Sequence, residues 1–410
     1  MDDSAMPAVP DAGRSPDGTS VGDATPTEPP GVPPGGGGGS GGPPLSAGCQ
    51  SAGEDVAGAD LPAGFCVRRF AKLGTPRTLV FAANGDLFVG SPSLSTAGGA
   101  TGGLGQIVIL SDDDHDGSAE LHVFATDVPD VHGLALGGGF LYFTTTAGVS
   151  RTPYVKGQRV EMAGAREDLG LPASFFADGR WTHGLTRSPG GQLYLSRGAY
   201  GSCGGAPGGA IGRIGVGVVD PVAKGFRNPM YMRCHRTDEV CAATELGEDQ
   251  TPGAREKLIF VGSGTDYGYP CCFSTAEPVT SAVSATSDVC GQVTHEEASF
   301  TLADTPFGFD WERQIWPEPF RDGIFVALHG SYYTTPAWAG AGIVYARTDP
   351  ATHKPVEGWH PFLGGFGPGG SALERPADVA FADDGRLFFA DDQGGAVYWI
   401  APRAVAPTTP

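Results

Sequence analysis

Short apolar runs separated by glycine- and aspartate-rich turns recur along most of this 410-residue chain. A turn followed by an apolar run occurs six times, and each copy comes shortly after another apolar run. Two apolar runs joined by a tight turn predict a β-hairpin. The six copies of the turn and second run occupy residues 84–90, 138–144, 190–196, 238–244, 322–328 and 384–390.

The spacing of these hairpins predicts the architecture. Successive matched positions lie 54, 52, 47, 84 and 63 residues apart, counted between Leu87, Leu141, Leu193, Val240, Ile324 and Leu387. Such a repeat fits four-stranded blades arranged radially. We therefore predict an all-β, six-bladed β-propeller over residues 61–402, with a seven-bladed ring or a β-sandwich as alternatives. The long step contains a cysteine cluster and predicts an insertion. We expect F-C-V-R-R-F near residue 65 to close the ring against V-Y-W-I-A near the C-terminus.

Residues 1–48 lack this pattern. They contain 12 Gly and 10 Pro, no aromatic residue, and six acids against a single base, Arg14. Such a segment cannot bury enough apolar surface to offset the entropy lost on ordering. We predict a disordered Gly/Pro-rich linker or tether.

The number and spacing of the cysteines indicate the cellular compartment in which the protein works. Their count is eight, and none of the spacings forms the C-x-x-C pair of a zinc knuckle. An even count in an acidic, Lys-poor chain favours disulfides and an oxidising compartment, whereas eight buried thiols are the alternative. The N-terminus, M-D-D-S-A, lacks the basic and apolar regions of a signal peptide. We expect an extracytoplasmic protein, periplasmic, surface-tethered or secreted, whose export signal is not present in this chain.

Charge and motifs exclude several classes of function. The formal net charge of −20, from 46 acids against 26 bases, repels phosphate backbones, so nucleic acid is a poor partner. No stretch of 18 apolar residues occurs, so no membrane span is predicted. No G-x-S-x-G nucleophile elbow and no helix-opening G-x-G-x-x-G are present, which disfavours a serine hydrolase and a nicotinamide-binding domain. We expect the acidity to lie on the outer surface, around a channel with a basic mouth.

Polar residues before the inner strands are the candidates for chemistry, because the loops entering those strands surround one mouth of a propeller channel. The residues just before five predicted inner strands are Arg77, His132, His183, the pair Arg227 and Asn228, and Arg375. Convergent cations suit a ligand with several carboxylates, although each residue singly could instead satisfy carbonyls at a blade junction. His132 and His183 are candidate general bases. His329 follows a strand, beside hydroxyls that could orient a sugar.

Residues 112–120, D-D-D-H-D-G-S-A-E, have the pattern of a calcium loop. Positions 1, 3, 5 and 9 of that pattern are Asp112, Asp114, Asp116 and Glu120. Position 12, the bidentate Glu of an EF-hand, is Val123, and both flanks read as strands. We predict a partial calcium site in a loop between strands, with a solvated acidic turn as the alternative.

Several longer segments carry a family resemblance. They are G-F-R-N-P-M at 225–230, T-D-Y-G-Y-P-C-C at 265–272, F-R-D-G-I-F-V-A-L-H-G-S at 320–331 and the run from 375 to 392. Together they resemble the soluble glucose/sorbosone dehydrogenase family over about residues 61–402. The resemblance implies a six-bladed quinoprotein that uses pyrroloquinoline quinone (PQQ) and calcium to oxidise an aldose or related sugar. Electrons would pass to an extracytoplasmic acceptor.

The resemblance also implies roles for single residues. Arg227 and Asn228 match residues that contact the quinone, and Arg375 could pair with one of its three carboxylates. Arg77, His132 and His329 complete the expected quinone-binding ring. The matches to calcium positions are Gly247 and Glu248, whose backbone carbonyls would bind the catalytic ion, and Glu256 and Tyr267, near a structural ion.

The catalytic base is the one departure from the family. A gapless match anchored on Gly191 and Leu193 places the family's base histidine at Arg180, and His183 lies three residues later. We assign the base to His183. The alternative function is a non-catalytic, calcium-stabilised extracellular propeller that binds carbohydrate or a protein partner.

Overall fold

The computed structural model describes residues 49, 55–93, 104–177, 179–247, 255–272, 290–294, 298–301, 304–331, 339–368 and 372–403. All of the described residues belong to one of the two units of the chain, Pro43–Pro410. The predicted disordered tail, residues 1–48, lies outside the described residues and stays a prediction.

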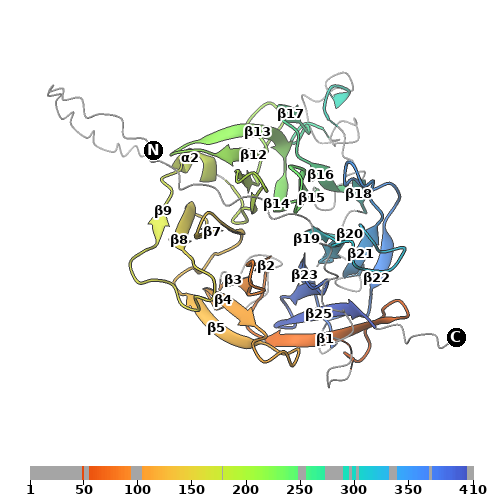
Figure 1. Ribbon diagram of the computed structural model, residues 1–410. Coiled ribbons are helices and arrows are strands. Elements are labelled where there is room, and N and C mark those ends of the chain that lie inside the picture. Colours follow the sequence, from red (N-terminus) through yellow and green to blue (C-terminus); the bar gives the residue numbers. More distant parts are fainter. Residues whose placement is uncertain are drawn as a thin grey trace, which may run out of the picture. The chain divides into compact units, whose positions relative to one another are not determined.

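The described part of the second unit is a six-sheet β-propeller, which confirms the predicted fold (Figure 1). Each predicted hairpin forms the two inner strands of one sheet. From inner to outer strand, the first three sheets are β2 (Thr78–Phe81), β3 (Leu87–Ser91), β4 (Gln106–Ser111), β5 (Glu120–Ala125); β6 (Leu134–Gly137), β7 (Phe140–Thr144), β8 (Val149–Pro153), β9 (Glu167–Asp168); and β10 (Leu185–Arg187), β11 (Leu193–Arg197), β12 (Gly209–Ile214), β13 (Val219–Phe226), β17 (Thr265–Asp266).

The other three sheets complete the ring. They are β14 (Asn228–Cys234), β15 (Cys241–Leu246), β16 (Glu256–Phe260), β18 (Ala298–Phe300); β19 (Pro306–Trp311), β20 (Ile324–Leu328), β21 (Gly342–Ala346), β22 (His360–Leu363); and β23 (Pro376–Phe381), β24 (Leu387–Asp391), β25 (Ala396–Pro402), β1 (Phe65–Lys72). A short helix, α2 (Ala173–Phe176), precedes the third sheet. No helix in the described part of the chain is long and apolar enough to cross a bilayer.

Burial explains why the strands are almost continuously apolar. Each blade packs between two neighbours, so both faces of its middle strands lose contact with water. β3, β20 and β24 are buried at every position. Trp316 and Trp399 are fully buried between blades.

Hydroxyls link consecutive blades at the ends of the second strands. Thr144 Oγ1 donates to the backbone carbonyl of His183 at 2.9 Å, and Ser196 Oγ donates to that of Pro229 at 2.6 Å. Thr244 Oγ1 makes the corresponding bond to Phe307 at 2.7 Å. These bonds fix the start of one inner strand against the preceding blade, which is where the candidate site residues lie.

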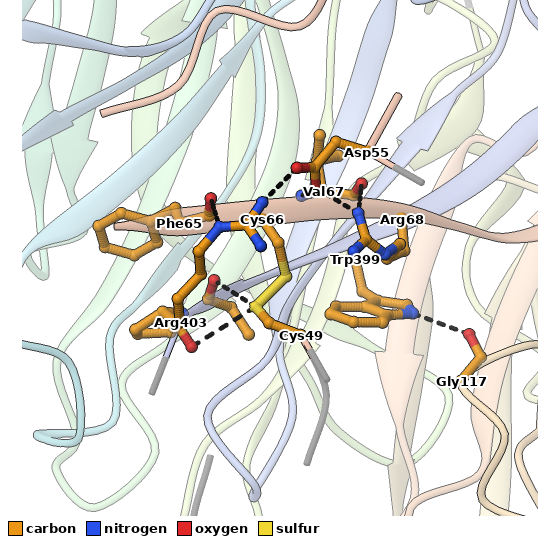
Figure 2. Close-up of a disulfide and its surroundings, with 11 residues drawn as sticks. Cys49, Asp55, Phe65, Cys66, Val67, Arg68, Gly117, Trp399 and Arg403 are labelled. Carbon is orange, nitrogen blue, oxygen red and sulfur yellow. Dashed lines mark hydrogen bonds and ion pairs between the residues drawn. A yellow bond between two sulfur atoms is a disulfide. The ribbon is translucent and has the colours of Figure 1, made fainter. Parts of the chain in front are cut away.

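The ring closes as predicted, because β1 pairs antiparallel with β25. A disulfide joins Cys66 on β1 to Cys49 (Figure 2). Beside it, Asp55 accepts hydrogen bonds from Arg68 and Arg403, which tie the chain before β1 to both closing strands. Closure therefore rests on backbone pairing and the Asp55 ion pairs, and the disulfide anchors the segment before β1 to that strand.

The remaining cysteines brace the predicted insertion and one hairpin. The insertion lies between β16 and β18, and its β17 pairs in parallel with β13 of the preceding blade. Disulfides Cys203–Cys271 and Cys272–Cys290 lie in this region, and Cys234–Cys241 closes the β14–β15 hairpin. With Cys49–Cys66 they use all eight cysteines, so the predicted disulfides are confirmed.

Candidate functional site

The basic residues predicted from the sequence gather at one end of the channel. Inner strands of a propeller run in one direction, so residues just before them share an end. His329 directly follows β20, a second strand that runs back to that same end. Each predicted ring residue is buried, with at most 8% of its surface exposed.

Arg77, His329 and Arg375 surround a buried carboxylate, Asp392. Arg77 Nε lies 2.7 Å from Asp392 Oδ2, and His329 Nε2 donates to the same carboxylate at 3.0 and 3.1 Å. Arg375 Nε and Nη2 donate to the backbone carbonyls of His329 and Gly330 at 2.8 and 2.7 Å. Asp392, which the sequence analysis missed, therefore offsets part of the predicted positive charge.

Burial and neighbouring charges set the protonation states of Asp392 and His329. Burial raises the pKa of Asp392, but Arg77, His329 and Arg375 outweigh it and lower that pKa to about 2. Burial and the charge of Arg375 lower the pKa of His329 to about 3. The cluster therefore contains a carboxylate anion and a neutral imidazole at neutral pH.

His183 has a defined tautomer. Its Nδ1 lies 3.2 Å from the backbone carbonyl of Ser196, which only accepts hydrogen bonds, so Nδ1 carries the proton. Nε2 is left with the lone pair that a general base needs. Burial lowers the pKa of His183 to about 4. The ring is 1% exposed and is in a T-shaped contact with Phe176 of α2, so a substrate reaches it only after a local rearrangement.

His132 has the same arrangement one blade earlier. Its Nδ1 lies 3.3 Å from the backbone carbonyl of His183, and its buried Nε2 has no hydrogen-bond partner among the described residues. Burial, followed by the charge of Arg77, lowers the pKa of His132 to about 3.

Aromatic rings form a layer across this end of the channel. The His132 ring lies 5.4 Å from Trp181 and 5.0 Å from Tyr231, and Tyr231 lies 5.4 Å from Phe307. Phe307 stacks on His329 at 4.0 Å. The sequence analysis assigned no role to Trp181, Tyr231 or Phe307, although two of them lie on inner strands. We call Trp181, His132, Tyr231, Phe307 and His329 the aromatic layer.

Arg227 and Asn228 lie where β13 gives way to β14. The backbone N–H of Arg227 donates to Glu245 at 2.6 Å, and Glu245 forms a buried ion pair with Lys257 at 2.7 Å. Asn228 Oδ1 accepts from Thr182 Oγ1 at 3.0 Å. Glu245 and Lys257 were not predicted, because an acid and a base inside strands carry no motif.

Of the predicted calcium ligands, Gly247 directly follows β15, one residue beyond the strand that carries Glu245. Glu248 lies outside the described residues. Glu256 accepts a hydrogen bond from the backbone N–H of Thr305, and Tyr267 donates to the backbone carbonyl of Phe260 at 3.2 Å. Both side chains therefore have structural bonds in the fourth blade.

Arg180, at the family's histidine position, lies beside the site. Its backbone N–H donates to Gly198 at 3.2 Å, and its guanidinium stacks 4.2 Å over the ring of Tyr200. A Cβ at Gly198 would come within 2.4 Å of Asn228 Oδ1 and 3.0 Å of Arg180 Cδ. The glycine thus lets Arg180 approach Asn228.

The acidic loop is confirmed as a turn between strands, β4 and β5, at the other end of the blade. Carboxylates of Asp112, Asp114 and Asp116 lie within 4.8 Å of one another, but Glu120 instead accepts a bond from the Asp113 N–H at 3.0 Å. Asp112 also lies 3.3 Å from Arg386. Calcium binding there stays a prediction.

Several solved structures superpose on this chain over most of its length. An AA12-family carbohydrate-active enzyme of Trichoderma reesei superposes with a TM-score of 0.67 at 18% identity, covering 84% of this chain and 97% of that one. The PQQ domain of pyranose dehydrogenase from Coprinopsis cinerea gives a TM-score of 0.66 at 16% identity, covering 84% and 97%. The PQQ-bound aldose sugar dehydrogenase of Streptomyces coelicolor gives 0.53 at 17% identity, covering 83% and 99%.

The chain shares the propeller fold of these proteins. No protein-family model matches it, and no curated protein matches its sequence. The fold similarity covers nearly the whole length of each neighbour, so it includes the end of the propeller that bears the predicted site.

Proposed function

We propose that this protein is a PQQ- and calcium-dependent dehydrogenase that oxidises an aldose or related sugar. The observation that carries the proposal is the place of Arg77, Arg227, Arg375 and three buried imidazoles next to strand ends at one end of the channel, with Arg77, Arg375 and His329 grouped around Asp392. Structural neighbours include a pyranose dehydrogenase PQQ domain and a PQQ-bound aldose sugar dehydrogenase.

The donor set fits the quinone chemically. Arginine guanidiniums and the Asn228 amide suit a planar molecule with three carboxylates. Arg227, Asn228 and Arg375 would hold it, and the backbone carbonyls of Gly247 and Glu248 would bind calcium. When bound, the quinone accepts two electrons as a hydride, and calcium polarises its reactive carbonyl.

His183 would remove the proton from the sugar hydroxyl through Nε2. The Ser196 carbonyl holds its tautomer, and burial keeps the ring neutral over a wide pH range. Phe176 of α2 is in contact with this ring. The chain thus supplies a neutral base with a fixed tautomer next to α2.

We also propose an extracytoplasmic location, with electrons passing to an acceptor in that compartment. The four disulfides support it, since such bonds persist in oxidising compartments. The acidic loop around Asp112 and the residues Glu256 and Tyr267 are proposed as additional calcium positions.

A non-catalytic binding propeller is the second candidate. Two observations favour it: Arg180 replaces the family's histidine, and His183 is 1% exposed in this conformation. Such a protein would keep the fold and bind carbohydrate or a protein partner without turnover.

Dye reduction distinguishes the two candidates. Purified protein is loaded with PQQ and calcium and assayed over a panel of aldoses with an artificial electron-acceptor dye. We expect calcium-dependent turnover that falls by about a hundredfold or more in His183→Ala, the loss typical of a removed general base. Loading without turnover on any sugar favours the binding propeller, and turnover that survives His183→Ala refutes only the base assignment.

A further inference from the structure

The channel holds a second site at its opposite end. A cavity of about 670 Å³ extends from the aromatic layer toward the turns that join the inner hairpin strands. Its inner end is lined by buried residues, including Thr78, His132 and Tyr231. Its outer end is lined by exposed Pro189 and Arg236, so it opens on the face away from the candidate catalytic site.

The walls of this cavity suit an organic molecule. Leu79, Leu134, Leu136 and Phe309 contribute apolar lining. A volume of this size, lined by apolar side chains together with polar and charged ones, can hold a small organic molecule. An inorganic ion would leave most of the wall without a contact.

The acids that line the cavity are paired. Asp310 lies 2.8 Å from Arg313 and 3.4 Å from Arg233, and Arg233 also lies 3.3 Å from Asp378. Burial raises the pKa of Asp378 to about 7, so a fraction of this carboxyl is neutral at neutral pH. At the mouth, Asp383 is paired with Arg236 at 2.6 Å.

Two lining cations have no acidic partner in the described part of the chain, Lys156 and Arg187. Arg187 is half-buried, and its guanidinium lies against Gly137 and Gly191, where a Cβ would come within 2.5 and 2.6 Å of its nitrogens. Both glycines have positive φ, +153° and +95°. Larger residues would displace the guanidinium from its present position, so the glycines form a cradle for it.

The inner end of the cavity offers one more polar contact. His132, which is 1% exposed, lines the cavity, and its Nε2 has no partner among the described residues. A buried nitrogen with no bond costs free energy unless water or a ligand satisfies it. An acceptor nitrogen makes no bond with a carboxylate, so the contacts for an anion are the unpaired cations toward the mouth of the cavity.

From the leucine and phenylalanine side chains of the lining and the unpaired cations Lys156 and Arg187, we infer that the channel cavity binds a small organic monoanion, an aromatic carboxylate in class. The carboxylate lies at Arg187 and Lys156, and the ring enters between the inner strands. This site is independent of the quinone and sugar proposed above.

Isothermal titration with 2-naphthoate tests this site, with the neutral 2-naphthamide as matched ligand. Arg187→Gln and Lys156→Gln remove the proposed contacts, and Arg69→Gln removes an exposed arginine from the outer strand β1. Arg375→Gln tests binding at the other end of the channel. Melting temperatures of all variants check folding.

We expect one naphthoate per chain, bound at least tenfold more tightly than naphthamide, with at least tenfold loss in Arg187→Gln and no change in Arg69→Gln or Arg375→Gln. No saturable binding, or equal affinity for naphthamide, overturns the inference. Loss in Arg375→Gln with none in Arg187→Gln also overturns it, because the anion would then occupy the candidate catalytic site.

Discussion

Burial sets the protonation of the three candidate-site histidines. Desolvation lowers the pKa of His132 to about 3, of His183 to about 4 and of His329 to about 3. A buried imidazolium would lose its hydration, so each ring stays neutral. Neutral rings serve as bases or hydrogen-bond partners, and the positive charge at this end comes from arginines.

The lowered pKa of His132 can be tested through the pH dependence of the free energy of unfolding. Its folded pKa, about 3, lies below the 6.5 of an ordinary histidine, so the unfolded chain binds a proton that the folded chain does not. The free energy of unfolding should therefore decrease as the pH falls from 6.5 toward 3. In His132→Asn this decrease should be shallower by up to about 1.4 kcal/mol per pH unit.

Urea unfolding at pH 7, 6 and 5 measures this slope, with exposed His360→Asn as the control variant. The same slope in His132→Asn and in the unmodified protein would show that folding does not lower the pKa of His132.

The location of a site residue could be predicted where that residue flanks a predicted strand. Contacts between residues that lie far apart in the sequence could not be predicted. Arg77, His132 and His183 precede hairpins, so their common location follows from the repeat. Asp392 lies 63 residues from His329, and nothing near either residue indicates the bond between them.

At the level of elements, all six hairpins and the closing strand were predictable, because turn residues and apolar runs are local signals. The pairing of β17 with β13 and the disulfide connectivity were not, since both depend on how the insertion between β16 and β18 folds back. The hydroxyl bonds of Thr144 and Ser196 between blades were also missed, because they are tertiary contacts.

The disulfide beside the closing strands should stabilise the folded protein measurably. Cys49–Cys66 joins residues 17 apart next to the β1–β25 pairing. A loop of this length is worth about 3 kcal/mol through the entropy of the unfolded chain. The double variant Cys49→Ala/Cys66→Ala should lose about that much free energy of unfolding.

Urea denaturation measures the loss, and Cys49→Ala/Cys66→Ala should remain a folded β-rich protein by circular dichroism. A change under about 0.5 kcal/mol would contradict the entropic contribution expected of this disulfide.

At the scale of the molecule, the two ends of the channel differ in the residues that line them. One end has the aromatic layer, the arginine ring and Asp392, and the other has an apolar cavity with unpaired cations at its mouth. The acidic loop at Asp112 lies at the cavity end rather than at the candidate catalytic end, a separation that the linear motif did not indicate.

Direct binding of PQQ tests the central claim. Equilibrium dialysis of the purified protein against PQQ, with calcium and with a calcium chelator, gives affinity and stoichiometry without depending on the sugar or the dye. We predict one PQQ per chain in calcium, lost with the chelator, at least tenfold weaker in Arg375→Gln and unchanged in Arg69→Gln. Failure of the unmodified protein to bind PQQ in calcium would contradict the account.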